Sequence, residues 1–245
     1  MSDDATSRAG LRPATNAGGS ETRPTTAASG DAGPKTTPQP LLARILRGKA
    51  WLWILIVALA AYPWTRLLSG DPFANANAAQ YLLDHAGTVA TAFLVAVLSL
   101  TPLRVLFPAS GIVRALNRHR RLTGVTAFGF AVLHLGYFWL HVGGWSGVLM
   151  EIDKPFIWSG LAAWTVLAVL TITSLNAIVR AMGARGWKRL HRAAYLAAAL
   201  ALYHQAAQQK EGYSESLWFF APLVLLEIAR VIRQRRDAAR SSAGL

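Results

Sequence analysis

The sequence predicts an all-α, polytopic membrane protein: a bundle of six transmembrane helices with both termini in the cytoplasm. Hydrophobic residues make up 53% of the 245 residues and charged residues only 15%, and the mean hydropathy is +0.31. This apolar share exceeds that of ordinary soluble domains. The apolar residues fall into long runs separated by charged residues, which is the pattern expected of helices that cross a bilayer.

A bilayer core of about 30 Å is crossed by about 20 helical residues. The runs that fit, to within a few residues at each end, are Ala50–Leu68, Ala86–Phe107, Leu122–Val142, Pro155–Leu175, Ala193–Ala207 and Ser216–Ile232. The fifth run is short and rich in alanine. Because small side chains let helices approach closely in lipid, we expect this helix to be buried among its neighbours.

Lysine and arginine gather on one side of the predicted membrane. That side holds Arg44, Arg47, Lys49, Arg104, Arg114, Arg118, Arg120, Arg121, Arg180, Arg185, Lys188, Arg189, Arg192, Arg230, Arg233, Arg235, Arg236 and Arg240. The other side holds Arg66, Lys154 and Lys210, with the acidic residues Asp71, Asp84, Glu151, Asp153, Glu211 and Glu215. By the positive-inside rule the basic side is cytoplasmic. The bias alternates with each loop in turn, which supports the count of six helices.

The formal net charge of +13 could by itself indicate nucleic-acid binding. The cations flank apolar runs, however, and form no single basic face interleaved with polar and aromatic contacts, so we expect no nucleic acid as a partner. Cytoplasmic cations suit the anionic headgroups of membrane lipid. An electronegative redox partner in the cytoplasm is the alternative explanation.

Three parts follow from composition: a disordered cytoplasmic arm over residues 1–40, the six-helix domain over 41–236, and a short tail over 237–245. The arm is rich in Ala, Thr, Gly, Ser and Pro and has no apolar core, and no signal peptide is visible.

The chain contains no cysteine. This excludes disulfides, thiolate-bound zinc, iron–sulfur clusters and covalent haem attachment through C-x-x-C-H.

Two of the six histidines, His134 and His204, lie inside apolar runs. An ionisable side chain at that depth is costly and marks a functional site by default. Both helices run outward from the cytoplasm, and each histidine lies ~17 Å from the start of its run at 1.5 Å per residue. Two imidazoles at one depth are what six-coordinate haem b requires. The alternative is that each histidine hydrogen-bonds a neighbouring helix or lines a proton path without metal.

The other candidate ligands are less well placed. Met150 and Met182 lie in loops and Met1 in the arm, so histidine is the only plausible ligand type. His191 lies 13 residues before His204, and that spacing turns the two side chains ~140° apart on one helix, so they face different neighbours. His191 is a ligand of a possible second haem, or else an interfacial headgroup or quinone contact.

Three further histidines have simpler interpretations. His141 lies seven residues after His134, on the same helix face, and is an interfacial residue, a substitute ligand or a quinone contact. His85 opens the second run as a solvated terminal residue. His119, in N-R-H-R-R, belongs to a cytoplasmic charge run.

Several motifs resemble a known family. They are T-P-L-R at Thr101–Arg104, R-R-L-T-G followed by A-V-L-H within Arg120–His134, K-P-F-I at Lys154–Ile157, I-T-S at Ile172–Ser174 and W-K-R-L-H-R-A-A-Y-L at Trp187–Leu196. Over roughly residues 45–235 the chain resembles the MsrQ (YedZ) family, the haem-binding membrane subunits of the periplasmic methionine sulfoxide reductase system. The most specific element is W-x-x-L-H-R-x-x-Y-L with a second histidine 13 residues after the first.

The resemblance implies a ferric-reductase-like transmembrane domain with haem b, one or two per chain, in the bacterial inner membrane. It implies electron delivery to a periplasmic, molybdopterin-dependent methionine sulfoxide reductase subunit, with the quinone pool or a flavin reductase as donor. By motif, His134 and His204 match the transmembrane haem ligands of the family and His191 matches its third histidine. Bound FMN is implied by the resemblance only, because no flavin motif is visible in this sequence.

Other functions remain open at this point. A ferric reductase or NADPH oxidase needs a flavin and nicotinamide domain, yet no G-x-G-x-x-G unit follows a predicted strand, so a separate electron donor is needed. A cytochrome b561-like quinol oxidoreductase would also hold haem b. A transporter or scaffold would hold no chromophore, but no internal repeat of the kind transporters show is found.

The resulting hypothesis is an electron path from the cytoplasmic side to the outer side. Electrons enter near His191 and the basic loop Arg180–Arg192, reach haem held by His134 and His204, and leave outward. Substrate chemistry belongs to a partner. The aromatic residues expected to pack the porphyrin are Tyr137, Phe138, Trp139, Tyr195 and Tyr203, with lipid-facing packing as the alternative for each.

Overall fold

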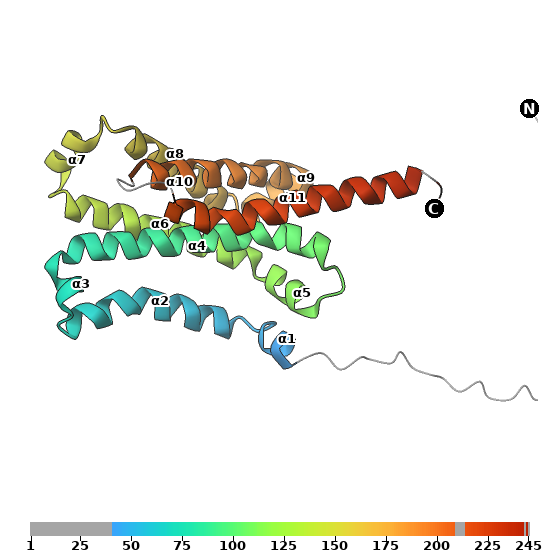
Figure 1. The fold of residues 1–245 in the computed structure, drawn as a ribbon, viewed down its shortest axis with the longest axis horizontal. Coiled ribbons are helices and arrows are strands. Elements are labelled where there is room, and N and C mark those ends of the chain that lie inside the picture. Colours follow the sequence, from blue (N-terminus) through green and yellow to red (C-terminus); the bar gives the residue numbers. More distant parts are fainter. Residues whose placement is uncertain (1–40, 209–213, 243, 245) are drawn as a thin grey trace, which may run out of the picture. The chain divides into compact units, whose positions relative to one another are not determined.

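A computed structural model of the chain describes residues 41–208, 214–242 and 244. Every regular element within these residues is a helix (Figure 1). The predicted arm over 1–40 and the outer loop residues Lys210 and Glu211 lie outside the described residues.

Each of the six predicted runs coincides with a helix. These helices are α2 (Ala50–Leu68), α4 (Ala78–Leu106), α6 (Arg120–His141), α8 (Pro155–Ile172), α10 (Ala194–Gln208) and α11 (Ser214–Ser242). Among the described residues, α2, α4, α6 and α8 are long and apolar enough to cross a membrane. The chain is therefore a multi-pass membrane protein, and the count of six spans stays a prediction.

The two remaining long helices differ from the other four in length or charge. Helix α10 has 15 residues, which is short for a span. Helix α11 has 29 residues, and Glu227 and Arg230 interrupt its apolar part. Its last turns carry four further arginines. The helix also includes residues 237–242, which belong to the predicted tail. Arginine, glutamine and alanine favour helix, and Asp237 lies 3.8 Å from Arg233 one turn earlier.

Short helices connect the long ones. They are α1 (Leu41–Ile45), α3 (Pro72–Ala76), α5 (Gly111–Arg118), α7 (Trp145–Glu151), α9 (Asn176–Leu190) and the 3₁₀ turn η1 (His191–Ala193). Side-chain oxygens begin two of them: Asp71 accepts from the N–H of Phe73 at 2.9 Å in α3, and Ser110 accepts from the N–H of Val113 at 3.3 Å in α5. Gly183 kinks α9 with φ of 69°, a value that favours glycine.

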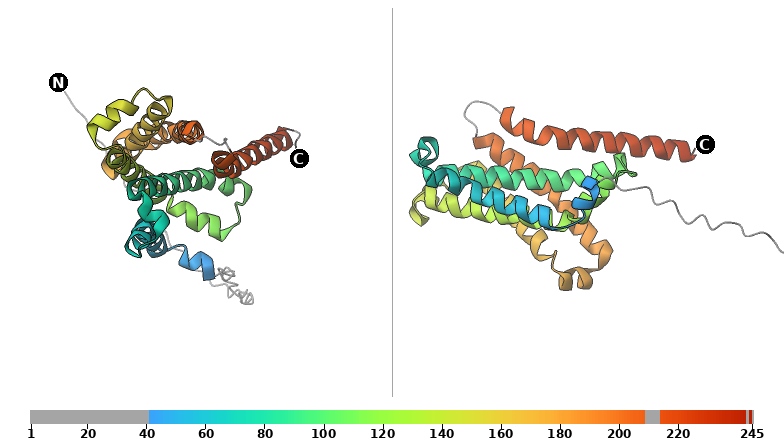
Figure 2. Two further views of the ribbon diagram at one scale, coloured as in Figure 1. Left: turned by 60° about the vertical axis from the view of Figure 1, so that its left-hand side comes forward. Right: turned by 90° about the horizontal axis from the view of Figure 1, so that it is seen from below.

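Helix α4 is the central helix of the described bundle. It packs against α6 along much of its length and also against α2, α10 and α11, while α8 packs on α10 (Figures 1 and 2). In the most apolar stretch of α4, 56% of the residues are buried, whereas the corresponding share is 11–22% in α2, α6 and α8. The alanine-rich α10 buries Ala197 and Ala198 between its neighbours, but α4 and not α10 forms the centre of the core. One face of α4 contributes Phe93, which stacks on Phe130 of α6 with ring centroids 6.0 Å apart.

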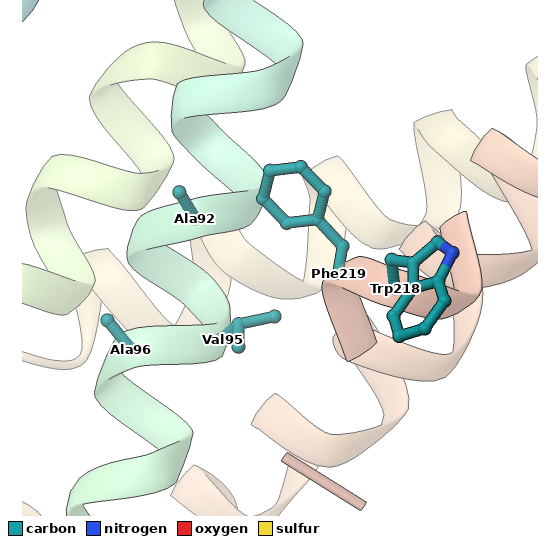
Figure 3. Close-up of a pocket in the computed structure, with 5 residues that line it drawn as sticks. All are labelled: Ala92, Val95, Ala96, Trp218 and Phe219. Atoms are coloured by element: carbon teal, nitrogen blue, oxygen red, sulfur yellow. The ribbon is translucent and has the colours of Figure 1, made fainter. Parts of the chain in front are cut away.

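A groove of about 470 Å³ lies between α4 and α11 (Figure 3). Ala92, Val95 and Ala96 of α4 form one wall, and Trp218 and Phe219 of α11 form the other. Ala92 and Ala96 present only methyl groups on this side of α4. Trp218 is 79% exposed at the rim of this groove.

The prediction for His85 was wrong, because α4 begins eight residues before the predicted run. The Asn77 side chain accepts from the N–H of Gln80 at 3.1 Å and starts the helix there, so polar residues such as Asp84 lie on its exposed side. His85 is consequently inside the helix and half-buried. Its Nε2 donates to the carbonyl oxygen of Leu59 in α2 at 2.7 Å.

The prediction for His119 was also wrong. Its side chain is only 3% exposed, and its Nε2 donates to the carbonyl oxygen of Leu46 at 2.9 Å. The Trp51 ring lies edge-on at 6.0 Å. His119 stands at the end of α5, and its contacts with Leu46 and Trp51 join the corner between α5 and α6 to the start of α2. The charged residues beside His119 in the sequence gave no sign of this buried contact.

We predict that His119→Ala lowers the free energy of unfolding by about 1–3 kcal/mol, because it removes a buried ring and its hydrogen bond to the Leu46 carbonyl, leaving Trp51 Nε1, 3.2 Å away, as the donor to that oxygen. His141→Ala is the control, since His141 is exposed, and we expect its change to stay within about 0.5 kcal/mol. Unfolding in detergent titrated with sodium dodecyl sulfate measures both. Equal losses in the two variants would contradict the anchoring role of His119.

Candidate functional site

The structure brings His134 of α6 and His204 of α10 together. Their ring centroids lie 6.0 Å apart and the ring planes are nearly perpendicular, at 86°. Both side chains are partly buried between α4, α6, α8 and α10. The two histidines that the sequence places at one depth are therefore neighbours in space.

Each ring is fixed through its Nδ1 atom by a backbone carbonyl of a neighbouring helix. His134 Nδ1 lies 3.0 Å from the Leu83 oxygen of α4, and His204 Nδ1 lies 2.7 Å from the Phe156 oxygen of α8. A carbonyl oxygen can only accept, so each Nδ1 carries the hydrogen and each Nε2 keeps a lone pair. The Gln208 side-chain nitrogen lies 3.0 Å from His204 Nε2, where it donates to that lone pair.

A glycine makes room for each ring. A Cβ atom on Gly87 of α4 would lie 2.7 Å from His134 Nδ1, and a Cβ on Gly160 of α8 would lie 2.6 Å from His204 Nδ1. Each glycine stands four residues after the carbonyl that accepts from the ring, one turn along the same helix face. The two sites therefore share one design: a glycine gap and a carbonyl one turn earlier.

The pair fits the axial ligands of a haem better than a bare metal ion. A metal–imidazole bond of about 2.0–2.1 Å on each side of one metal would place the ring centroids about 6.4 Å apart, slightly more than the observed 6.0 Å. Within the described residues no group of three or more His, Cys, Asp or Glu side chains could hold an ion. Two histidines suffice where a porphyrin supplies the other four nitrogens.

His191 lies apart from this pair, in the 3₁₀ turn η1. Its Nδ1 donates to the Trp187 carbonyl at 3.1 Å, its Nε2 lies 3.2 Å from the Ser174 hydroxyl, and the Trp187 ring stacks on it at 3.9 Å. Burial lowers the pKa of His191, and the nearby Arg120 guanidinium lowers it further, against the hydrogen bonds to the Trp187 and Leu170 backbone, which raise it. The described neighbours include no second imidazole that would pair with His191 across an iron.

The structure adds one aromatic residue beside the pair and gives one of the predicted aromatic residues a different partner. Phe156 lies 6.1 Å from the His204 ring, tilted by 54°, and was not predicted. Tyr195 donates instead to Glu227 of α11 at 2.8 Å, and Glu227 pairs with Arg230 at 2.8 Å, so Tyr195 serves the α10–α11 contact. Trp139 is 41% exposed and Tyr203 51% exposed, while Tyr137 and Phe138 are partly buried.

Sequence reasoning missed Gly87 and Gly160. An isolated glycine in an apolar helix is a signal of close approach by another group. That signal does not name the partner, because the ring that fills each gap belongs to a residue 47 positions after Gly87 or 44 positions after Gly160.

Part of the chain matches a known family of transmembrane proteins. Residues 86–202 match the family described as ferric reductase like transmembrane component. This match includes His134 and His191 and ends two residues before His204.

The chain is also similar to several curated proteins. The protein-methionine-sulfoxide reductase heme-binding subunit MsrQ of Polaromonas naphthalenivorans is 37% identical over 62% of this chain and 68% of that protein. The MsrQ of Rhodospirillum rubrum is 33% identical over 77% of this chain and 92% of that protein. The magnetosome protein MamZ of Magnetospirillum gryphiswaldense is 33% identical over 70% of this chain but only 28% of that protein.

The glycine gaps predict opposite effects of the same substitution at different sites. Gly87→Ala and Gly160→Ala should each lower the free energy of unfolding by about 1–3 kcal/mol, because the new methyl group overlaps an imidazole. Gly136→Ala is the matched control on α6, where no atom lies within 4 Å of the added Cβ. It should raise stability by up to about 1 kcal/mol through helix propensity. A stabilising effect at all three positions, in the same detergent titration, would disprove the gaps.

The environment of His191 predicts a pKa below the ordinary value of about 6.5. The folded state then prefers the neutral ring, so the unfolded state binds the proton first as the pH falls. Stability should decrease as the pH drops from about 6.5 toward the folded pKa, and His191→Gln should reduce that slope. Histidine resonances followed by NMR, with His191→Gln as the assignment control, give the pKa directly. A value at or above 6.5 contradicts the prediction.

Proposed function

The chain belongs to the MsrQ family of haem-binding subunits, and from this we propose that it is a membrane electron-transfer subunit that holds haem b between His134 and His204. Its electrons go to a periplasmic catalytic subunit that reduces methionine sulfoxide in oxidised proteins. The observation that carries the proposal is the pair of neighbouring imidazoles, with ring centroids 6.0 Å apart, each held through Nδ1 so that Nε2 is the nitrogen left to bind a metal.

Bound haem supplies a one-electron iron couple whose potential depends on its ligands and on their hydrogen bonds. The chain contributes the ligands and their orientation. The Nδ1–H bonds to the Leu83 and Phe156 carbonyls fix the tautomer of each imidazole and raise the basicity of its Nε2. Gln208, which now donates to His204 Nε2, has to turn away for that nitrogen to bind iron.

We propose that both termini face the cytoplasm and that the membrane is the bacterial inner membrane. The cation-rich segments α5, α9 and the C-terminal half of α11 lie at one end of the described bundle, and α3 and α7 lie at the other (Figure 1). The positive-inside rule makes the first end cytoplasmic. Six spans then require α10 and α11 to cross as well, with Glu227 and Arg230 paired where α11 nears the cytoplasmic surface.

Electron entry belongs at the cytoplasmic end. Helix α9 carries Arg180, Arg185, Lys188 and Arg189, and His191 follows α9 directly, so an acidic reductase has a basic surface to approach. A quinol, which is uncharged, would approach the same end through hydrogen bonds. A second haem at His191 would need a ligand other than histidine from the described residues around it. FMN remains an implication of the family resemblance.

The partner on the outer side carries the substrate chemistry. The MsrQ relatives are named as subunits of a methionine sulfoxide reductase, and the family resemblance implies a molybdopterin-dependent catalytic subunit. The outer end of the described bundle consists of short helices such as α3 (5 residues) and α7 (7 residues), which suit a docking surface better than a catalytic domain.

The test is a reduced-minus-oxidised visible spectrum of detergent-purified protein, with a pyridine haemochrome assay for haem per chain. We expect sharp b-type bands in the natural protein and their loss in His134→Ala and in His204→Ala. His141→Ala is the control on the same helix as His134 and should keep full haem. Loss of only part of the haem in His191→Ala would identify a second site there.

Two results would refute the proposal in different ways. Full haem in both His134→Ala and His204→Ala would show that these residues are not the ligands. No haem in the natural protein, even when haem is supplied during expression, would indicate a transporter or scaffold instead.

A further inference from the structure

A second polar contact joins α10 to α4 beside the histidine pair. Gln205 follows His204 directly, and its side-chain nitrogen donates to the Thr91 hydroxyl of α4 at 2.6 Å. Thr91 is only 6% exposed, and its hydroxyl donates in turn to the Gly87 carbonyl at 3.0 Å. Both polar side chains are therefore engaged inside an otherwise apolar helix contact.

Thr91 extends the surface of α4 that receives His134. Leu83, Gly87 and Thr91 are spaced by four residues, so they lie one turn apart on one face of the helix. The Leu83 carbonyl accepts from His134, Gly87 leaves space for its ring, and Thr91 receives Gln205 from the helix that carries His204. One face of α4 thus contacts both His134 and the helix that carries His204.

We infer that Thr91 and Gln205 are positioning residues for the haem ligands. Their hydrogen bond fixes the height and rotation of α10 against α4, and His134 is fixed on that same face of α4. The bond consequently sets the position of the His204 imidazole relative to that of His134. This inference rests on the proposed function of the pair.

The energetics of helix contacts in lipid support this role. A hydrogen bond between side chains of two membrane helices adds only modest net stability, since apolar packing holds most of the contact. Removing the Thr91–Gln205 bond should therefore leave the bundle assembled. Without the bond, α10 can shift or rotate against α4. The His204 imidazole would then move relative to that of His134, and a small displacement is enough to disturb a pair of metal ligands.

Gln208 differs from Gln205 in the partner that its side chain contacts. It lies one turn beyond His204 on α10 and also reaches the site, with its nitrogen 3.0 Å from His204 Nε2. That contact uses the lone pair that iron would take, and it connects α10 only to itself. Gln208 therefore has no role in positioning α10 against α4.

The experiment compares Thr91→Val and Gln205→Leu, which remove the bond with little change of shape. The controls are Ser99→Ala on α4 and Thr165→Val on α8, since each hydroxyl donates within its own helix, to Val95 at 2.8 Å and to Leu161 at 2.8 Å. Three properties are measured on haem-loaded protein: the rate of haem transfer to apomyoglobin, the midpoint potential, and the g-values of the oxidised iron by electron paramagnetic resonance. Circular dichroism checks the fold of each variant.

We expect haem to leave Thr91→Val and Gln205→Leu roughly tenfold faster than it leaves the natural protein. Tenfold is the lower end of the loss in metal affinity usual when a residue that orients a ligand is replaced. The g-values and the midpoint potential should shift with the angle between the imidazoles. The double variant should be no worse than either single variant, because both remove the same bond. Thr91→Ser, which keeps the hydroxyl, should restore the natural values, and both controls should match the natural protein.

Natural transfer rate, potential and g-values in Thr91→Val and Gln205→Leu would overturn the inference while leaving the haem assignment intact. Equal shifts in the controls would also overturn it, because they would reflect a general loosening of the bundle. A natural protein that binds no haem would instead refute the proposed function, so the two failures are distinguishable.

Discussion

A histidine inside a bilayer must have its N–H group satisfied by the protein itself, and the candidate site depends on how this is done. Water is absent at that depth, so an unpaired ring nitrogen would be costly. Carbonyl oxygens at Leu83 and Phe156 accept from the Nδ1 atoms of His134 and His204. The same bonds that satisfy the buried rings also keep the hydrogen on Nδ1, so that Nε2 of each ring is the nitrogen with a lone pair. Stability and ligand geometry therefore have one cause.

The helices could largely be predicted from the sequence, because long apolar runs between charges have few alternatives in a membrane protein. The predicted range Ala50–Leu68 is the observed range of α2, and all other runs fall on helices. Helix ends were predicted less well, since caps and exposed polar faces decide them. Asn77 starts α4 eight residues before the apolar run, which is why His85 was taken for a terminal residue. The charged neighbours of His119 likewise hid its buried bond to Leu46.

His134 and His204 lie at equal depth in their apolar runs, and this equal depth predicted that they would be neighbours in the bundle. It could not foresee what holds them. The contacts of Gly87 and of Gln205 join residues that lie far apart in the chain and on different helices, and a single sequence does not state which helix faces which. The same limit explains Tyr195, whose hydroxyl turns to Glu227 and not toward the pair.

The most direct test of the central claim is near-infrared magnetic circular dichroism of the oxidised, purified protein at low temperature, because the charge-transfer band of low-spin haem reports which atoms ligate the iron. The account predicts the band of two neutral imidazole ligands in the natural protein. It also predicts that imidazole added to His134→Ala during haem loading restores that band. A natural protein with high-spin iron, or with one histidine and a different second ligand, would contradict the account.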